Sequence, residues 1–301
     1  MSKTIVEVKD FSYKYPRTTN PVLKNINFNI DEGEYIGIVG PTGSGKTTLC
    51  MALSGLIPQV LGGKLTGEIL INGKNSKDTS IDEMIFSSEK RESFVGITFQ
   101  DPEAQLVGMT VEEDIAFGPE NLGIEPEKIN NVVDEVLNLI RMNSFRDSFP
   151  YLLSGGQKQR VGIGATLALR PKLVILDEPT SELDPLGRKE VLNVIKSLKE
   201  QKIAVVIVEH NTEELVGFVD RVVVLHEGEV VLDDATDVVF KQTEFLRSIG
   251  VRPPEGFDLI ERLVSAELLP QMQHGPYDEE AIVQYLSDFI RSKLNHVKAN
   301  Y

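Results

Sequence analysis

The chain has 301 residues, of which 41% are hydrophobic, and its 31 basic and 46 acidic side chains leave a net charge of −15. This size and apolar content predict one large domain with an appendage, or two domains, and exclude global disorder. The negative charge argues against non-specific binding of nucleic acid over the whole surface. The single cysteine, Cys50, excludes an internal disulfide framework and a cysteine-only metal cluster, which fits a reducing, intracellular setting.

No segment of the sequence predicts passage into or across a membrane. Residues 1–16 lack the apolar region of a secretory signal, so we expect none. The longest apolar runs, at residues 173–176 and 203–208, have the length and β-branched content of buried strands. Spanning a bilayer takes about 18 apolar residues. We therefore expect a soluble chain, for which other polypeptides provide any membrane part.

Short strands with turns dominate the first 73 residues. Four strands are predicted there, at residues 4–8, 25–30, 35–40 and 67–73. The last ends at Asn72-Gly73, a strong turn signal. A helix is predicted over residues 46–57, where apolar residues recur at helical spacing. The polar residues 74–93 are expected to form a surface excursion before a further strand at 94–100.

Helices and strands alternate through the second half of the chain. Helices are predicted at residues 126–142, after Gly155, and at 184–201. Strands are predicted at residues 173–179 and 203–210, followed by a hairpin that turns at Glu227-Gly228. Buried strands that alternate with helices indicate a mainly parallel sheet covered on both faces.

Residues 250–256, with the sequence GVRPPEG, break this pattern and predict a domain boundary. We expect a main domain over residues 1–245 and a C-terminal helical extension over residues 246–301. Two helices are predicted in the extension, one carrying residues 257–264 and one that starts near Asp278. The extension is either an appendage packed on itself or on the main domain, or a dimerisation element.

A glycine-rich segment at residues 40–48, GPTGSGKTT, fits the phosphate-loop pattern G-x-x-x-x-G-K-[ST] between a predicted strand and a predicted helix. Its glycines let backbone N–H groups surround phosphates, and the helix N-terminus adds partial positive charge. Lys46 would reach the β- and γ-phosphates of a nucleotide, and the Thr47 hydroxyl would ligate Mg²⁺. The predicted nucleotide-binding residues of this loop are Gly40, Pro41, Thr42, Gly43, Ser44, Gly45, Lys46, Thr47 and Thr48.

Polar side chains end three of the predicted strands. With a phosphate loop in the same chain, Asp177 is suited to hold Mg²⁺ and Glu178 to act as general base on the attacking water. His210 and Gln100 end two other strands, and ligands bind at the carboxyl edge of such sheets. For these two residues, a surface position and a polar strand cap are the alternatives.

The stretch LLSGGQKQR, at residues 152–160, offers a hydroxyl, two adjacent glycines, amides and basic groups, but no proton-transfer group. Together with the motifs above, it makes about the first 240 residues similar to the ATP-binding-cassette (ABC) ATPase family. That resemblance implies an α/β P-loop NTPase fold with a RecA-like parallel sheet core, an antiparallel β subdomain and an α-helical subdomain.

The ABC resemblance also implies roles for individual residues. The segment LSGGQ resembles the family signature, which caps the ATP held by a second subunit, so it implies γ-phosphate contacts in trans. The residues concerned are Ser154, Gly155, Gly156 and Gln157. Gln100 is similar to the family glutamine that contacts Mg²⁺, the attacking water and the membrane partner. His210 is similar to the switch histidine, which completes a catalytic set with Lys46, Gln100 and Glu178.

Two further family positions follow from the same comparison. Residues 181–184 resemble the D-loop that crosses the dimer interface. Tyr15 best matches the aromatic residue that stacks on adenine, and Tyr13 is the alternative. ATP and Mg²⁺ are the cofactors that the resemblance implies.

A narrower resemblance comes from residues 99–124, FQDPEAQLVGMTVEEDIAFGPENLGI, which are similar to the ATPase subunits of energy-coupling-factor (ECF) importers of vitamins, cobalt or nickel. It implies a second ATPase subunit, a transmembrane coupling subunit and a membrane-embedded substrate-binding subunit as partners, and a peripheral location on the cytoplasmic face of the membrane. No nucleic-acid partner is expected. The alternatives are the ATPase of another ABC transporter class and a soluble, non-transport ABC protein.

Overall fold

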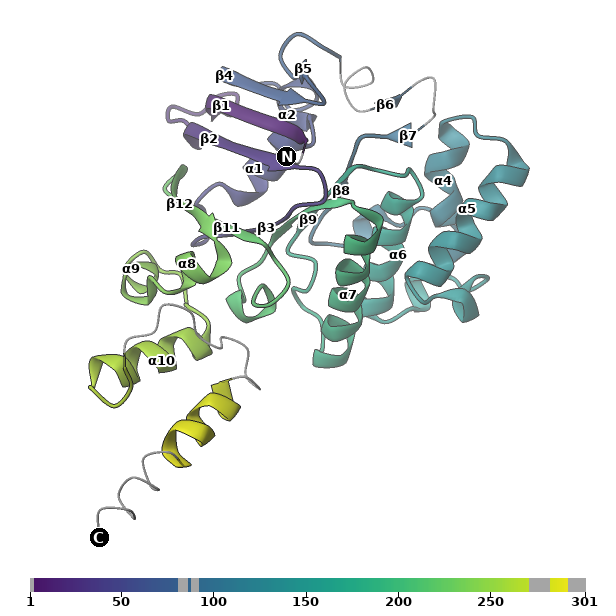
Figure 1. The fold of residues 1–301 in the computed structure, drawn as a ribbon. Coiled ribbons are helices and arrows are strands. Elements are labelled where there is room, and N and C mark those ends of the chain that lie inside the picture. Colours follow the sequence, from purple (N-terminus) through teal and green to yellow (C-terminus); the bar gives the residue numbers. More distant parts are fainter. Residues whose placement is uncertain (1–2, 81–85, 88–91, 271–281, 292–301) are drawn as a thin grey trace.

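The computed structural model describes residues 3–80, 86–87, 92–270 and 282–291. A six-stranded sheet forms the centre of the molecule, in the order β12-β11-β3-β10-β9-β8 (Figure 1). Only β12 pairs antiparallel, and the other neighbours in this sheet run parallel. Its strands are β3 (Tyr35–Val39), β8 (Val95–Thr98), β9 (Leu173–Asp177), β10 (Ala204–Val208), β11 (Arg221–His226) and β12 (Glu229–Ala235).

An antiparallel sheet in the order β2-β1-β4-β5 lies above the central sheet in Figure 1. Its strands are β1 (Thr4–Lys14), β2 (Leu23–Asp31), β4 (Lys64–Ile71) and β5 (Lys74–Asn75), and a two-stranded pair follows with β6 (Phe86–Ser87) and β7 (Glu92–Ser93). The predicted turn between β4 and β5 is confirmed, because Asn72 and Gly73 both have positive φ, 50° and 76°. The four strands predicted in the first 73 residues are all present as β1, β2, β3 and β4, and β1 is longer than expected.

The central sheet has one hydrophobic core on each face, because successive side chains of a strand point to opposite faces of the sheet. Along β10, Val205 and Ile207 belong to one core, and Ala204, Val206 and Val208 belong to the other. The second core also contains the antiparallel sheet and α1 (Lys46–Leu53). Every residue of β3, β9 and β10 is buried, which confirms the prediction of a parallel sheet covered on both faces.

Four helices gather at the right of Figure 1 and cover the first core. They are α4 (Val111–Asn121), α5 (Pro126–Leu139), α6 (Gly155–Leu167) and α7 (Pro185–Ser197). Short 3₁₀ turns connect the elements of the chain, at η1 (Glu103–Gln105), η2 (Asn143–Phe145), η3 (Pro150–Leu152), η4 (Leu198–Gln201) and η5 (Thr212–Glu214). The helix predicted from residue 126 is confirmed as α5, in which Val132, Val133, Val136 and Leu137 form the buried apolar face.

The single helix expected over residues 46–57 is wrong. The chain leaves the helical path after α1, because Gly55 adopts a left-handed conformation with φ 77°, and the separate α2 (Leu56–Gln59) follows. A small residue with positive φ ends a helix in the same way at many helix C-termini. Apolar spacing continued across this break, so the sequence pattern alone did not reveal it.

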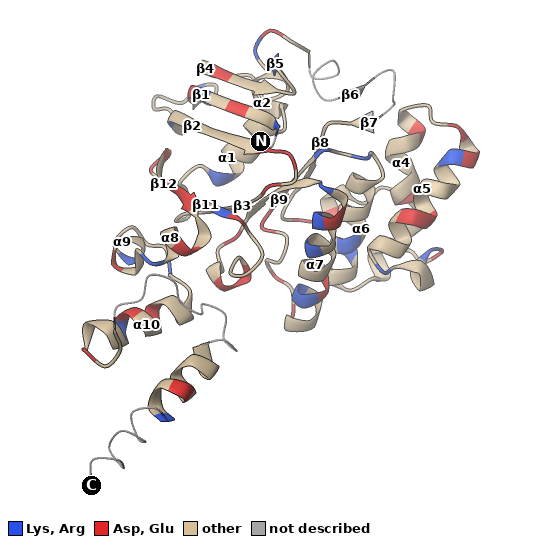
Figure 2. Ribbon diagram, viewed as in Figure 1, with Lys and Arg blue, Asp and Glu red and all other residues tan. Residues whose placement is uncertain are grey.

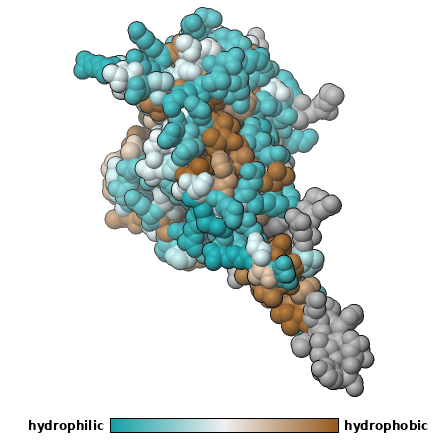
Figure 3. Space-filling view, turned by 90° about the vertical axis from the view of Figure 1, so that its left-hand side faces the viewer, coloured by the Kyte–Doolittle hydropathy of each residue, from teal (hydrophilic) through white to brown (hydrophobic). Residues whose placement is uncertain are grey.

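The C-terminal segment forms α8 (Thr236–Phe240), α9 (Thr243–Ser248), α10 (Glu255–Ser265) and a helix over residues 282–291. Leu246, Val251 and Phe257 pack into the first core. A separate hydrophobic cluster joins α10 to the last helix through Ile260 and Ile282. The predicted helix start near Asp278 lies outside the described residues. Figure 3 shows apolar side chains on these protruding helices, and the boundary at residue 245 stays a prediction.

Within the described ranges, no helix is both long and apolar enough to cross a membrane. Basic and acidic residues are mixed along α5 and α7 (Figure 2).

Candidate functional site

The phosphate loop lies between the end of β3 and the start of α1, as predicted. Gly40 has no room for a side chain, because a Cβ there would lie 2.1 Å from the carbonyl oxygen of Leu225. Gly43 and Gly45 have positive φ, 81° and 104°, and the space beside Gly43 is open. The loop therefore needs glycine for its path and leaves its outer side free for a ligand.

Lys46 folds back over this loop. Its Nζ donates to the carbonyl oxygens of Gly40 at 2.9 Å and Pro41 at 3.1 Å. The side chain is buried, which lowers the pKa of Lys46, and the nearby carboxylates of Glu178 and Asp177 partly oppose that shift. An anion bound in the loop would give this ammonium a charged partner that two carbonyls do not supply.

A cavity of about 240 Å³ opens beside the loop. It brings residues from the loop together with Glu178 and His210, which come from positions far apart in the sequence. Its lining consists of Val22, Thr42, Gly43, Gly45, Lys46, Thr47, Thr48, Glu178 and His210. The sequence pattern gave no reason to expect Val22, an apolar residue that precedes β2.

Asp177 ends β9 beneath the cavity and is only 4% exposed. Its Oδ1 is buried without a hydrogen-bond partner, while a side-chain hydrogen bond links the carboxylate to Thr47. Burial raises the pKa of Asp177 above its usual value, and the hydrogen bond from Thr47 is the strongest opposing influence. A cation at this place would find an unpartnered carboxylate oxygen next to a hydroxyl.

The donor set at this place fits Mg²⁺. The described residues hold no group of three or more His, Cys, Asp or Glu side chains that could form a complete metal site. Mg²⁺ is usually held by one or two protein oxygens, with water and substrate phosphates as its other ligands. Thr47 and Asp177 supply such oxygens, so the ion would need a nucleotide to complete its coordination.

Glu178 and His210 are in contact with each other in the wall of the cavity. The Nε2 of His210 lies 2.8 Å from the Oε1 of Glu178. Glu178 has a left-handed backbone with φ 53°, a costly conformation for a residue other than glycine. The backbone N–H and the hydroxyl of Ser181 both donate to the Glu178 carbonyl oxygen, at 3.1 and 2.9 Å, and so hold the turn that aims this carboxylate into the cavity.

The two candidate aromatic residues differ in their surroundings. Tyr13 is fully buried in the antiparallel sheet, and its hydroxyl donates to the Gly62 carbonyl oxygen at 2.8 Å. Tyr15 is half-buried, and its hydroxyl lies 3.1 Å from the Thr48 hydroxyl, beside the phosphate loop. Only Tyr15 has ring surface that a ligand of this loop could contact.

The other predicted residues lie outside this cavity. Gln100 is exposed two residues beyond the end of β8, at the same sheet edge as Asp177. Ser154 begins α6 as its N-cap, and a capping box joins it to Gln157. Gln100, Ser154 and Gln157 do not line the cavity of the phosphate loop.

The two signature glycines have different neighbours. Gly155 is exposed at the first turn of α6, where its backbone is open to a second molecule. Gly156 is buried, and a Cβ there would lie 2.7 Å from the Cα of Gly187 in α7. Asp184, the last residue of the predicted D-loop, caps α7 by accepting a hydrogen bond from the Gly187 N–H at 2.7 Å. The second glycine thus serves helix packing in this chain.

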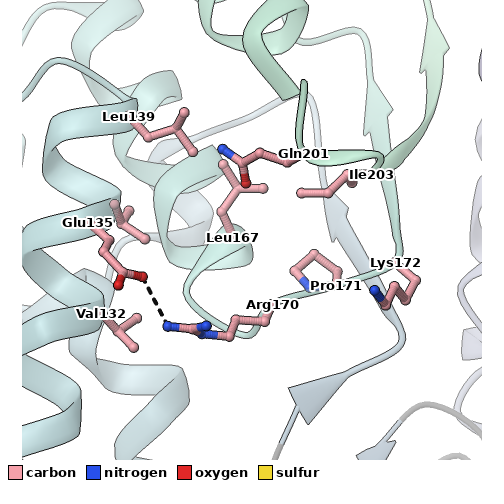
Figure 4. Close-up of a pocket in the computed structure, with 10 residues that line it drawn as sticks. Val132, Glu135, Leu139, Leu167, Arg170, Pro171, Lys172, Gln201 and Ile203 are labelled. Carbon is pink, nitrogen blue, oxygen red and sulfur yellow. Dashed lines mark hydrogen bonds and ion pairs between the residues drawn. The ribbon is translucent and has the colours of Figure 1, made fainter. Parts of the chain in front are cut away.

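Another cavity, of about 460 Å³, lies between α5 and α6 and the chain that leads into β9 and β10 (Figure 4). Its rim carries an ion pair between Arg170 and Glu135 at 2.9 Å. Lys172 and Ile203, which also line it, directly precede the starts of β9 and β10. The cavity is therefore at the amino edge of the sheet, whereas ligands of such sheets bind at the carboxyl edge, where the phosphate loop lies.

Comparisons with known proteins identify the family. A family model described as ABC transporter matches residues 23–181. The chain belongs to this ABC transporter ATP-binding family. It is 45% identical over 263 residues to a predicted ABC transporter ATP-binding protein of Pyrococcus horikoshii, covering 86% of this chain and 90% of that protein. It is 40% identical, over 86% of this chain and 91% of the other, to the energy-coupling factor transporter ATP-binding protein EcfA1 of Caldanaerobacter subterraneus subsp. tengcongensis.

Two solved structures resemble this ABC ATPase. CbiO1 of Clostridium perfringens, part of the ABC transporter complex CbiONQ, has a TM-score of 0.70 and 32% identity, over 86% of this chain and 99% of that one. A dimeric ATP-binding cassette in a post-hydrolysis state, bound to ADP and Pi, has a TM-score of 0.64 and 30% identity, over 77% of this chain and 98% of that one. The predicted fold class and the likeness to CbiO- and EcfA-type ATPase subunits are confirmed.

Proposed function

We propose that this ABC ATPase is the ATP-hydrolysing subunit of an ECF-type importer and drives uptake of a vitamin, cobalt or nickel through membrane partners. The observation that carries the proposal is the 40% identity to EcfA1 over 91% of that protein. The likeness to CbiO1, part of the complex CbiONQ, supports the same class. Family membership by itself implies only an ATP-binding subunit of an ABC transporter with ATPase activity.

The reaction would use the residues gathered at the carboxyl edge of the sheet. Tyr15 would stack on adenine, and the loop N–H groups with Lys46 would bind the β- and γ-phosphates. Glu178 would take a proton from the attacking water while His210 contacts the γ-phosphate. Mg²⁺, held by Thr47 and Asp177 with Gln100 as a further contact, would neutralise charge on the phosphates.

A second copy of this chain, or a related chain, would complete each site. Ser154, the N-cap of α6, and the first-turn residues Gly155, Gly156 and Gln157 do not line the cavity of their own phosphate loop. The exposed N-terminus of α6 would instead meet the γ-phosphate bound by the partner. The extension over residues 246–301 would add to this dimer through its exposed apolar side chains, among them Leu259 and Ile290.

Membrane partners would dock beside Gln100, on the cytoplasmic face. The segment that follows this residue carries exposed apolar side chains, Val107 at 60%, Met109 at 68% and Phe117 at 50% exposure. Exposed apolar residues grouped on one surface are typical of protein interfaces. A transmembrane coupling subunit would cover them, and a membrane-embedded subunit would choose the cargo.

Purification from membranes tests the transporter class. The tagged full chain, isolated in mild detergent from its own organism, should bring with it a coupling subunit and a small hydrophobic substrate-binding subunit, identified by mass spectrometry. A Met109→Glu, Phe117→Glu variant should lose both while still binding ATP. Recovery of a permease without any small hydrophobic subunit would indicate another transporter class, and recovery of no membrane protein would refute the proposal.

A further inference from the structure

One hydroxyl lies between two carboxyl groups behind the candidate site. The Thr180 Oγ1 is 2.8 Å from the Glu209 Oε1 and 2.5 Å from the Glu214 Oε2. The backbone N–H of Thr180 also donates to the Glu209 Oε1, at 3.2 Å. A hydroxyl has a single proton to donate, so it can serve only one of two ionised carboxylates. The other short contact therefore requires a proton on a carboxyl group.

The surroundings of the two carboxyl groups decide which one carries that proton. The Oε1 of Glu214 lies 3.0 Å from Nη1 of Arg188 and accepts from the Asn211 amide at 3.1 Å, as suits an ionised carboxylate. Glu209 is 3% exposed and has no ion-pair partner among the described residues. Burial, with the negative charges of Glu214 and Glu178 nearby, raises the pKa of Glu209 to about 8.

We propose that Glu209 is a positioning residue of the ATPase reaction, a neutral carboxylic acid that donates to Thr180, which in turn donates to Glu214. This inference rests on the proposed function. Thr180 stands two residues after the candidate base Glu178, and Glu209 directly precedes His210. The relay thus connects the loop after β9 to the end of β10 and fixes the position of Glu178 relative to His210.

The relay fails when Glu209 loses its proton. Thr180 then faces two ionised carboxylates with one proton to offer, and Glu178 adds a third negative charge nearby. Arg188 is already paired with Glu214, so this cation is not placed to neutralise the new charge. Because the turn at Glu178 depends on its neighbours for its left-handed conformation, hydrolysis should fall at alkaline pH.

The first test compares the pH dependence of ATPase activity, from about pH 6 to about pH 10, in the full chain and three variants. Glu209→Gln keeps the shape and a donor to the Thr180 hydroxyl, although its Nε2 cannot also accept from the Thr180 N–H. Because it has no proton to lose, its kcat should not fall at alkaline pH, and at neutral pH its kcat should exceed that of Glu209→Ala. Glu209→Ala should lose about tenfold or more in kcat at neutral pH, with little change in KM, because the relay acts on the base and not on nucleotide binding.

Glu229→Gln, a change at an exposed carboxylate of β12, is the matched control and should reproduce the wild-type profile. An alkaline fall in Glu209→Gln at the wild-type position would overturn the proposal, as would equal losses in Glu209→Gln and Glu209→Ala. Lys46→Ala tests whether the measured hydrolysis comes from this site. If Lys46→Ala does not reduce ATPase activity, the result contradicts the proposed function and not the role of Glu209.

A second readout does not depend on activity. Infrared spectra of the nucleotide-free chain, labelled with ¹³C at glutamate carboxyl groups, should show a protonated carboxylic acid at neutral pH that disappears in alkaline buffer. The band should be missing in Glu209→Gln and present in Glu229→Gln. If the wild-type chain has no such band at neutral pH, Glu209 is ionised and the relay does not exist, whatever the outcome for ATP hydrolysis.

Discussion

The contact between α6 and α7 gives a stability prediction for the two signature glycines. In Gly156→Ala, the added Cβ would lie 2.7 Å from the Cα of Gly187 and 3.3 Å from its carbonyl carbon. Ordinary van der Waals contact begins near 3.4 Å, so the two helices must move apart by roughly 0.7 Å, and no flexible side chain can give way instead.

The expected cost follows from this overlap. Overpacking of a close contact costs about 1–3 kcal/mol, and replacing glycine by alanine in a helix returns about 0.5–1 kcal/mol. A backbone-to-backbone overlap of roughly 0.7 Å falls in the upper part of the overpacking range, so Gly156→Ala should lower the free energy of unfolding by about 1–2.5 kcal/mol. In the matched variant Gly155→Ala, the Cβ meets only the Cδ2 of Leu183, at 3.2 Å, and Gly155 is exposed, so the change should stay within about 0.5 kcal/mol.

Urea denaturation of both variants without nucleotide measures this difference, and m should be unchanged. Equal stability of the two variants would refute the packing argument. The contact between Gly156 and Gly187 also bears on any variant meant to test whether the signature segment contacts a nucleotide bound by a partner subunit. A side chain at Gly156 would disturb the packing of α6 against α7 as well as the signature segment, so its effect on activity would have two causes. Ser154 and Gly155, which are exposed, are the better positions for such tests.

Three other predictions concern the base, its buried neighbour and a helix cap. Glu178→Gln should still bind ATP and hydrolyse it about 10²- to 10⁴-fold more slowly in phosphate-release assays, and near-normal turnover would exclude Glu178 as the base. Glu209 has a folded-state pKa of about 8 against an ordinary 4.5, so the folded chain binds more protons between these values and wild-type stability falls as pH rises through this range. Glu209→Gln should remove that loss, a gain on the order of a few kcal/mol near pH 8.5 and little near pH 4.5, measured by urea denaturation; a pH-independent difference would contradict it. Thr110→Ala removes the α4 cap, in which Thr110 accepts from the Glu113 N–H at 3.2 Å, and should cost about 0.5–2 kcal/mol in the same assay, whereas no cost would show that Glu113 holds the cap alone.

The sequence by itself determined the features that depend on neighbours along the chain. The phosphate loop needs a glycine pattern between a strand and a helix, and residues 40–48 carry all of it. Apolar spacing fixed the buried face of α5, and Asn72-Gly73 fixed the turn after β4. Because parallel strands end at one edge, the order of strands also predicted that Glu178 and His210 would lie near the loop.

Only the tertiary structure decided the contacts between segments that are distant in the sequence. Burial inside the antiparallel sheet distinguishes Tyr13 from Tyr15, which look alike in the sequence. Gly156 appeared to be a phosphate-binding glycine, and its place against α7 shows a packing role as well. Glu209 was not singled out in the sequence, because a strand pattern does not reveal that the side chains of Thr180 and Glu214 lie next to it. A carboxyl group takes its protonation state from burial and from neighbouring charges, and those exist only after the chain has folded.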